Sequence, residues 1–147
     1  MHPADFLTVE NSLIDVRAST KKELLVQLCV RAAVVLALDG DMLLSVVQNR
    51  EELGSTGMGD GVALPHARIP ELQKVFAILA RLQKPLAFDA IDNRPVDIVC
   101  MLFLPAGRSG ESLNALAAVA RKLRDPEARD RLRQCTSAAA LHREMVA

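Results

Sequence analysis

The sequence has no tryptophan and no tyrosine, and aromatic residues make up only 3% of its 147 residues. Proteins that hold single-stranded nucleic acids or sugars by ring stacking depend on aromatic side chains, so this way of binding is excluded. The chain also lacks a net charge, because 18 Lys and Arg residues balance 18 Asp and Glu residues. Since binding to nucleic acids or anionic membranes needs a basic surplus, we expect neither partner.

Cysteine is scarce and long apolar runs are absent. Cys29, Cys100 and Cys135 are odd in number and widely spaced in apolar contexts, which predicts small buried hydrophobic residues. The longest apolar runs, such as residues 96–104, fall far short of the roughly 20 residues that a membrane-spanning helix needs. The N-terminus carries no signal-peptide pattern. We therefore expect a cytoplasmic protein, with residues 1–147 forming a single domain.

What the sequence does contain is a mixture of helical and strand patterns. Apolar residues at helical spacing, with caps at their starts, predict helices that follow Thr20, Asp41, Asp125 and Ser137, and a further helix around residues 113–123. Continuous apolar runs predict strands over residues 75–82 and 96–104, the second of them central and covered on both faces. The predicted fold class is α/β, with a small mixed β-sheet flanked by helices on both sides.

The segment 50–68 contains a glycine-rich stretch, residues 54–61, followed by Pro65 and His66. A triphosphate-binding loop would need Lys and then Ser or Thr where Asp60 and Gly61 stand. A dinucleotide-binding loop needs the order strand, glycines, helix, whereas here a predicted helix precedes the glycines. Both phosphate-loop alternatives therefore fail.

What remains is a loop rich in backbone amides close to His66, with Arg50 and Arg68 nearby in the sequence. Imidazole is a nucleophile at neutral pH, and arginine and backbone amides compensate the charge of a phosphoryl group. The simpler interpretation is that His66 only packs or is solvated, as most lone histidines are. The three histidines are far apart in the sequence, so we expect no metal and no other cofactor.

At these residues the sequence resembles the enzyme IIA components of the mannitol/fructose class of the bacterial phosphoenolpyruvate:sugar phosphotransferase system (PTS). Their active-site pattern is matched at every position by Glu51, Met58, Gly59, Val62, Ala63, Leu64, Pro65, His66 and Ala67. Residues 88–97 resemble the mid-domain segment of this family, in particular that of its nitrogen-regulatory branch. The C-terminal run 116–125 also fits.

The resemblance implies a three-layer sandwich like that of the mannitol-type IIA domains. It implies that His66 accepts a phosphoryl group on Nε2 from the phosphohistidine of the carrier HPr, or of its nitrogen-branch counterpart. Arg50 matches the arginine beside the phosphohistidine of relatives, and Ser55 and Thr56 match loop hydroxyls that shape the loop or contact phosphate. The carrier is expected to dock on an apolar surface, for which Met58, Leu64 and Ile69 are candidates.

The sequence departs from the family at the start of the third helix. Relatives commonly carry a histidine before a leucine there, and this chain has Ser112 before Leu113. A serine can donate a hydrogen bond to phosphate but carries no positive charge, so onward transfer is expected to be weaker. Alternatively, backbone amides at the start of this helix supply enough stabilisation.

Three functions follow from these residues. The preferred one is a nitrogen-regulatory IIA domain without attached IIB or membrane domains, a phosphocarrier rather than a turnover enzyme, whose phosphorylation state controls regulatory target proteins. The second is a fructose- or mannitol-type IIA subunit that passes the phosphoryl group to a IIB protein during sugar uptake. The third is a degenerate binding module that is not phosphorylated, which the replacement at Ser112 keeps open.

Overall fold

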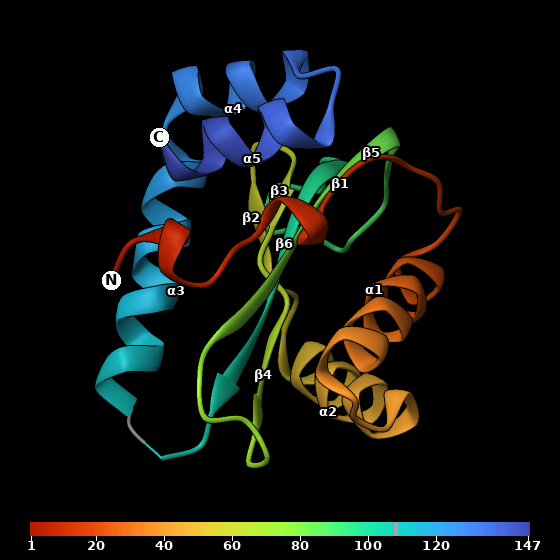
Figure 1. Ribbon diagram of the computed structural model, residues 1–147. Helices are drawn as coiled ribbons and strands as arrows, with labels where there is room; N and C mark the ends of the chain where they lie inside the picture. Colours follow the sequence, from red (N-terminus) through yellow and green to blue (C-terminus); the bar gives the residue numbers. More distant parts are fainter. Residues whose placement is uncertain (108) are drawn as a thin grey trace.

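The computed structural model describes residues 1–107 and 109–147, and it has helices on both sides of a sheet (Figure 1). The helices are α1 (Lys21–Leu36), α2 (Gly40–Leu53), α3 (Ser109–Arg124), α4 (Pro126–Gln134) and α5 (Ala138–Val146). The strands are β1 (Ser12–Val16), β2 (Gly57–Gly59), β3 (Val62–Ala63), β4 (His66–Ile69), β5 (Phe76–Leu86) and β6 (Val96–Pro105). Two short 3₁₀ helices, Pro3–Asp5 and Val9–Asn11, precede β1.

The strands form one mixed sheet in the order β1-β5-β6-β3-β2, and β4 also pairs with β6. Strands β5 and β6 are antiparallel, whereas β1 is parallel to β5, and β3 and β4 are parallel to β6. The near-continuous apolar sequence of β6 is explained by its central place in the sheet. The predicted α/β class with a mixed sheet and helices on both faces is confirmed.

Each face of the sheet has its own hydrophobic core. Helices α1 and α2 cover one face, and α3, α4 and α5 cover the other (Figure 1). Along β6, Met101 and Phe103 point into the core under α1 and α2, whereas Leu102 and Leu104 point into the core under α3. Because neighbouring side chains of a strand point to opposite faces, this one strand supplies both cores.

Most of the predicted helix caps are present. The side chains of Thr20, Asp125 and Ser137 each accept a hydrogen bond from a backbone amide in the first turn of the helix that follows. The prediction for α2 is wrong, because its N-cap is Asp39 rather than Asp41. The Asp39 carboxylate accepts a hydrogen bond from the Asp41 amide at 2.9 Å, which places Asp41 inside the helix.

The three cysteines are buried and unpaired, as predicted. Burial raises the pKa of Cys29 and Cys100 to about 12, so both thiols stay protonated and pack as small hydrophobic groups. In the described part of the chain, no helix is both long and apolar enough to cross a membrane.

Candidate functional site

His66 is the first residue of β4, a short strand that the sequence patterns did not predict. Within residues 1–107 and 109–147, β4 pairs only with β6, with His66 opposite Leu102. Ala67 and Ile69 are buried in the core under α1 and α2. Since side chains alternate along a strand, His66 and Arg68 point to the other face. His66 is half-buried there and Arg68 is exposed.

The ring of His66 is held by the backbone of its own segment. Its Nδ1 lies 2.8 Å from the carbonyl oxygen of Leu64. A carbonyl oxygen can only accept, so Nδ1 carries a proton and Nε2 of the neutral ring carries the lone pair. Burial lowers the pKa of His66, and the hydrogen bond to Leu64 opposes this effect. At neutral pH the ring is therefore neutral, with a nucleophilic Nε2.

Two arginines lie close enough to influence His66. The positive charges of Arg50 and Arg68 lower the pKa of His66 further, whereas the negative charge of Glu51 raises it. Arg50 comes from the last turn of α2, where its Nη1 donates to the carbonyl of Gly54 at 2.9 Å. Neither arginine forms an ion pair in the part of the chain that the structure describes. Two such guanidinium groups beside a neutral imidazole suit an incoming anion.

The hydroxyls of Ser55 and Thr56 are used inside the loop between α2 and β2. Ser55 Oγ donates to the carbonyl of Phe88 at 2.8 Å and accepts a hydrogen bond from the Gly57 amide at 3.1 Å. Thr56 Oγ1 donates to the buried carboxylate of Glu51, which also accepts a hydrogen bond from the Thr56 amide at 3.1 Å. Both side chains therefore fix the shape of this loop.

The glycine-rich stretch packs against a second loop, residues 87–95. A Cβ atom added to Gly57 would lie only 2.7 Å from both Cα and Cβ of Ala90. The amide of Asp60 donates to the carboxylate of Asp92 at 2.9 Å, which fastens the two loops together. Gly57 is therefore required because the backbones of the two loops approach each other closely. The number of glycines in the sequence does not distinguish this packing role from a role in binding phosphate.

Comparison with known proteins shows the family to which this chain belongs. Residues 5–146 match the family model described as "Phosphoenolpyruvate-dependent sugar phosphotransferase system, EIIA 2". The chain belongs to this EIIA family. It is 37% identical over 138 residues to the "Nitrogen regulatory protein" of Bradyrhizobium diazoefficiens, and the match covers 94% of this chain and 90% of that protein.

Solved structures of EIIA proteins have the same fold. The nitrogen regulatory protein IIA-Ntr of Neisseria meningitidis superimposes with a TM-score of 0.90 at 28% identity, covering 96% of this chain and 97% of that one. The mannitol IIA of Escherichia coli, solved in complex with phosphorylated IIB, superimposes with a TM-score of 0.78 at 16% identity. That match covers 95% of this chain and 97% of the mannitol protein. The predicted likeness to mannitol-type IIA domains is confirmed at the level of the fold.

Ser112 lies in the first turn of α3, on the face of the sheet toward which His66 points. Its side chain is buried, and its Oγ donates to the carbonyl of Pro105 at 3.4 Å. In the described structure no hydrogen bond joins Ser112 to His66. The hydroxyl of Ser112 is thus engaged with the end of β6 rather than with His66.

The predicted docking residues are mostly wrong. Leu64 is 7% exposed and Ile69 is 0% exposed, because each packs into one of the two cores, and neither offers a surface to a partner. Exposed apolar side chains lie instead at Leu53, the last residue of α2, and at Ile91, which lies beside Gly59. The sequence does not show which apolar residues around such short strands face inward.

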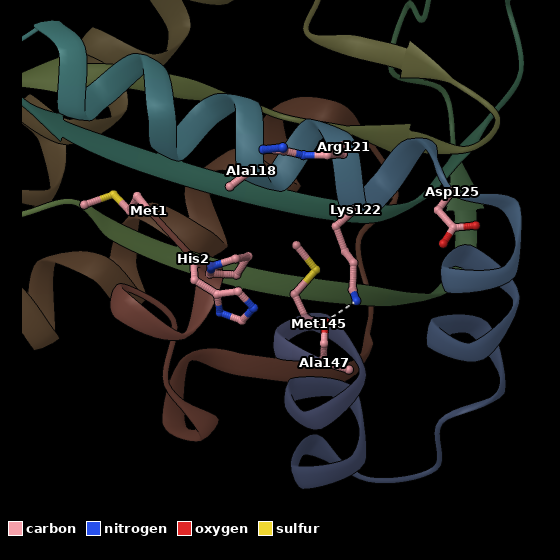
Figure 2. Close-up of a pocket in the computed structure, with 9 residues that line it drawn as sticks. Met1, His2, Ala118, Arg121, Lys122, Asp125, Met145 and Ala147 are labelled. Atoms are coloured by element: carbon pink, nitrogen blue, oxygen red, sulfur yellow. Dashed lines mark hydrogen bonds between the residues drawn. The ribbon is translucent and has the colours of Figure 1, made fainter.

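A separate hollow lies where the two ends of the chain meet α3 and α5 (Figure 2). Met1, His2, Lys122 and Met145 line it, and Lys122 Nζ donates to the carbonyl of Ala147 at 2.7 Å. No residue predicted for the functional site lines this hollow. His66 lies instead on β4, which in the described residues pairs with β6 alone.

Proposed function

We propose that this EIIA protein is a histidine phosphocarrier, in which Nε2 of His66 accepts a phosphoryl group from the phosphohistidine of an HPr-type carrier. The observation that carries the proposal is the neutral ring of His66, with its proton held on Nδ1. Beside it lie two arginines that form no ion pair with the described carboxylates. The family and the pattern that ends in Pro65-His66 support the same residue.

The proposed transfer uses these groups directly. The lone pair of Nε2 forms the new N–P bond while the N–P bond of the donor breaks, and the donor imidazole takes back the electron pair. The proton on Nδ1 stays in place, and the Leu64 carbonyl stabilises the positive charge that the ring gains. Arg50 and Arg68 compensate the negative charge of the phosphoryl oxygens during the transfer.

We further propose that the phosphorylation state of His66 regulates target proteins. The 37% identity to a relative named as a nitrogen regulatory protein supports this role. The second candidate is a sugar-uptake subunit that passes the phosphoryl group to a IIB protein. The fold shared with mannitol IIA is compatible with this role. The buried Ser112 favours regulation, because it supplies no positive charge for a second transfer.

The test is an intact-mass measurement of the protein after incubation with phosphoenolpyruvate, enzyme I and HPr. We expect a gain of one phosphoryl group that is lost in mild acid and is absent from the His66→Ala variant. The matched control is His2→Ala, which removes an exposed histidine and keeps His66. No gain with HPr or its nitrogen-branch counterpart would instead indicate a binding module that is not phosphorylated. Rapid loss of the label to IIB proteins would favour the sugar-uptake candidate.

A further inference from the structure

A continuous chain of hydrogen bonds links the first turn of α1 to the ring of His66. Lys21 Nζ lies 2.8 Å from Glu51 Oε2, and the same carboxylate accepts a hydrogen bond from the Thr56 amide at 3.1 Å. The Thr56 carbonyl accepts a hydrogen bond from the Leu64 amide at 3.0 Å. The Leu64 carbonyl in turn accepts a hydrogen bond from the proton-bearing Nδ1 of His66 at 2.8 Å.

We propose that Lys21 is a positioning residue for phosphoryl acceptance, acting through this chain on the tautomer and orientation of His66. The inference rests on the proposed function of His66. Lys21 lies far from His66 in the sequence and outside the family pattern around it. Its contribution therefore comes from the fold, which brings the start of α1 beside the end of α2.

The position of the Lys21 ammonium group is fixed by several contacts. Besides the ion pair with Glu51, Nζ donates to the Phe88 carbonyl at 3.4 Å and lies 4.4 Å from the centre of the Phe88 ring. The side chains of Lys21 and Glu51 are only 19% and 5% exposed. A buried carboxylate that loses its cationic partner is left uncompensated and must take up a proton or rearrange. The pair therefore holds the Glu51 carboxylate in the place where it accepts the hydrogen bond of the Thr56 amide.

Loss of Lys21 has a chemical consequence at His66. When the Glu51 carboxylate no longer holds Thr56, the Thr56 carbonyl releases the Leu64 amide, and the Leu64 carbonyl loses its fixed position. The proton of the His66 ring is then free to move to Nε2, and that tautomer has no lone pair on the reacting atom. We therefore expect slower phosphoryl acceptance in a protein that still folds.

The neighbouring Lys22 supplies a matched control. It is exposed, and in the residues that the structure describes it forms no ion pair and no side-chain hydrogen bond. Lys22→Met therefore removes the same charge from the same helix turn and leaves the hydrogen-bond chain complete.

The test compares Lys21→Met, Lys22→Met and the double variant Lys21→Met/Glu51→Gln with the wild type. The first readout is the tautomer of His66 in the unphosphorylated protein, from the ¹⁵N shifts of its ring. The second is the rate of phosphoryl uptake from phospho-HPr. We expect Lys21→Met to populate the tautomer with the proton on Nε2 and to slow uptake by about tenfold or more. Lys22→Met should match the wild type.

The double variant keeps the inference testable if Lys21→Met unfolds. It removes the uncompensated charge, and the side-chain carbonyl oxygen that Glu51→Gln leaves in place can still accept from the Thr56 N–H, so the tautomer and most of the rate should return. A folded Lys21→Met protein with the wild-type tautomer and rate would overturn the inference, as would a folded double variant that shows the same losses as Lys21→Met. If the wild type takes up no phosphoryl group, the proposed function fails. The tautomer of His66 in the variants then still shows whether Lys21 acts on the ring through the hydrogen-bond chain.

Discussion

His66 donates the proton on its Nδ1 to the carbonyl of Leu64, two residues earlier in the same segment, across 2.8 Å. The backbone therefore decides which ring nitrogen is available for chemistry. Neighbouring side chains such as Arg50 and Arg68 alter the charge around the ring and leave the identity of the reacting atom unchanged. Changes to the backbone contact and changes to these side chains therefore have different expected effects on His66.

Arg50 and Arg68 are predicted to lower the pKa of His66 and to assist phosphoryl transfer. Arg50→Gln and Arg68→Gln each remove a positive charge near the ring, so the pKa of His66 measured by NMR titration should rise in both variants. Phosphoryl uptake should slow by about tenfold, since charge compensation at the transferring group is lost. Arg131→Gln is the control, because Arg131 pairs with Glu127 and Glu144 in the α4–α5 region. An unchanged pKa in both test variants would contradict this assignment.

The stability of the fold is predicted to depend on pH through His66. Burial lowers the pKa of His66 in the folded state, so the unfolded chain binds this proton at a higher pH, near the ordinary value of about 6.5. Stability is therefore complete above that value and decreases as the pH falls toward the pKa of the folded state. Urea unfolding at about pH 7.5 and about pH 5.5 should show a larger loss for the wild type than for His66→Gln. Equal losses would show that the pKa of His66 is not lowered.

Gly57 is predicted to be intolerant of any side chain. Gly57→Ala places a Cβ 2.7 Å from the backbone and side chain of Ala90, so the two loops must separate. The free energy of unfolding should fall by about 1–3 kcal/mol, the usual cost of overpacking. Gly110→Ala is the control, because a Cβ there meets no described atom from outside its own part of α3 within 4 Å, and in this helix it should stabilise the protein slightly. Similar unfolding midpoints for Gly57→Ala and the wild type would refute the close approach of the loops.

Ser112 is predicted to act in folding rather than in phosphoryl binding. Its hydroxyl is buried and donates to Pro105, so Ser112→Ala should cost about 1 kcal/mol of stability. Because the hydroxyl is already used there, phosphoryl uptake should stay within about twofold of the wild type. Uptake that slows tenfold without loss of stability would instead make this hydroxyl a phosphate ligand.

The sequence predicts the layers of the fold well, and for physical reasons. Long periodic segments such as residues 21–36 and the apolar run of β6 contain enough residues for their pattern to be clear. Strands β2, β3 and β4 span only a few residues each, too few for any periodicity, and β4 is the one that carries His66. The prediction of His66 therefore depended on the motif around it, and its local geometry did not follow from the sequence.

The residues that support the site leave little trace in the sequence. Lys21 lies in a helix whose sequence is that of an ordinary amphipathic segment, and nothing in its surroundings links it to Glu51 until α1 and α2 pack together. Ser55 and Thr56 were recognisable as loop residues, but their partners, Phe88 and Glu51, depend on tertiary contacts. Long-range contacts of this kind leave no periodic signal in a single sequence.

The most direct test of the proposed function is to find which atom carries the phosphoryl group. The protein, labelled with ¹⁵N and phosphorylated through phosphoenolpyruvate, enzyme I and HPr, is examined by long-range ¹H–¹⁵N NMR of its histidine rings. We predict one phosphorylated histidine, His66, with phosphorus on Nε2 and the proton still on Nδ1. A phosphoryl group on Nδ1 of His66, on another residue, or on no residue at all would contradict it.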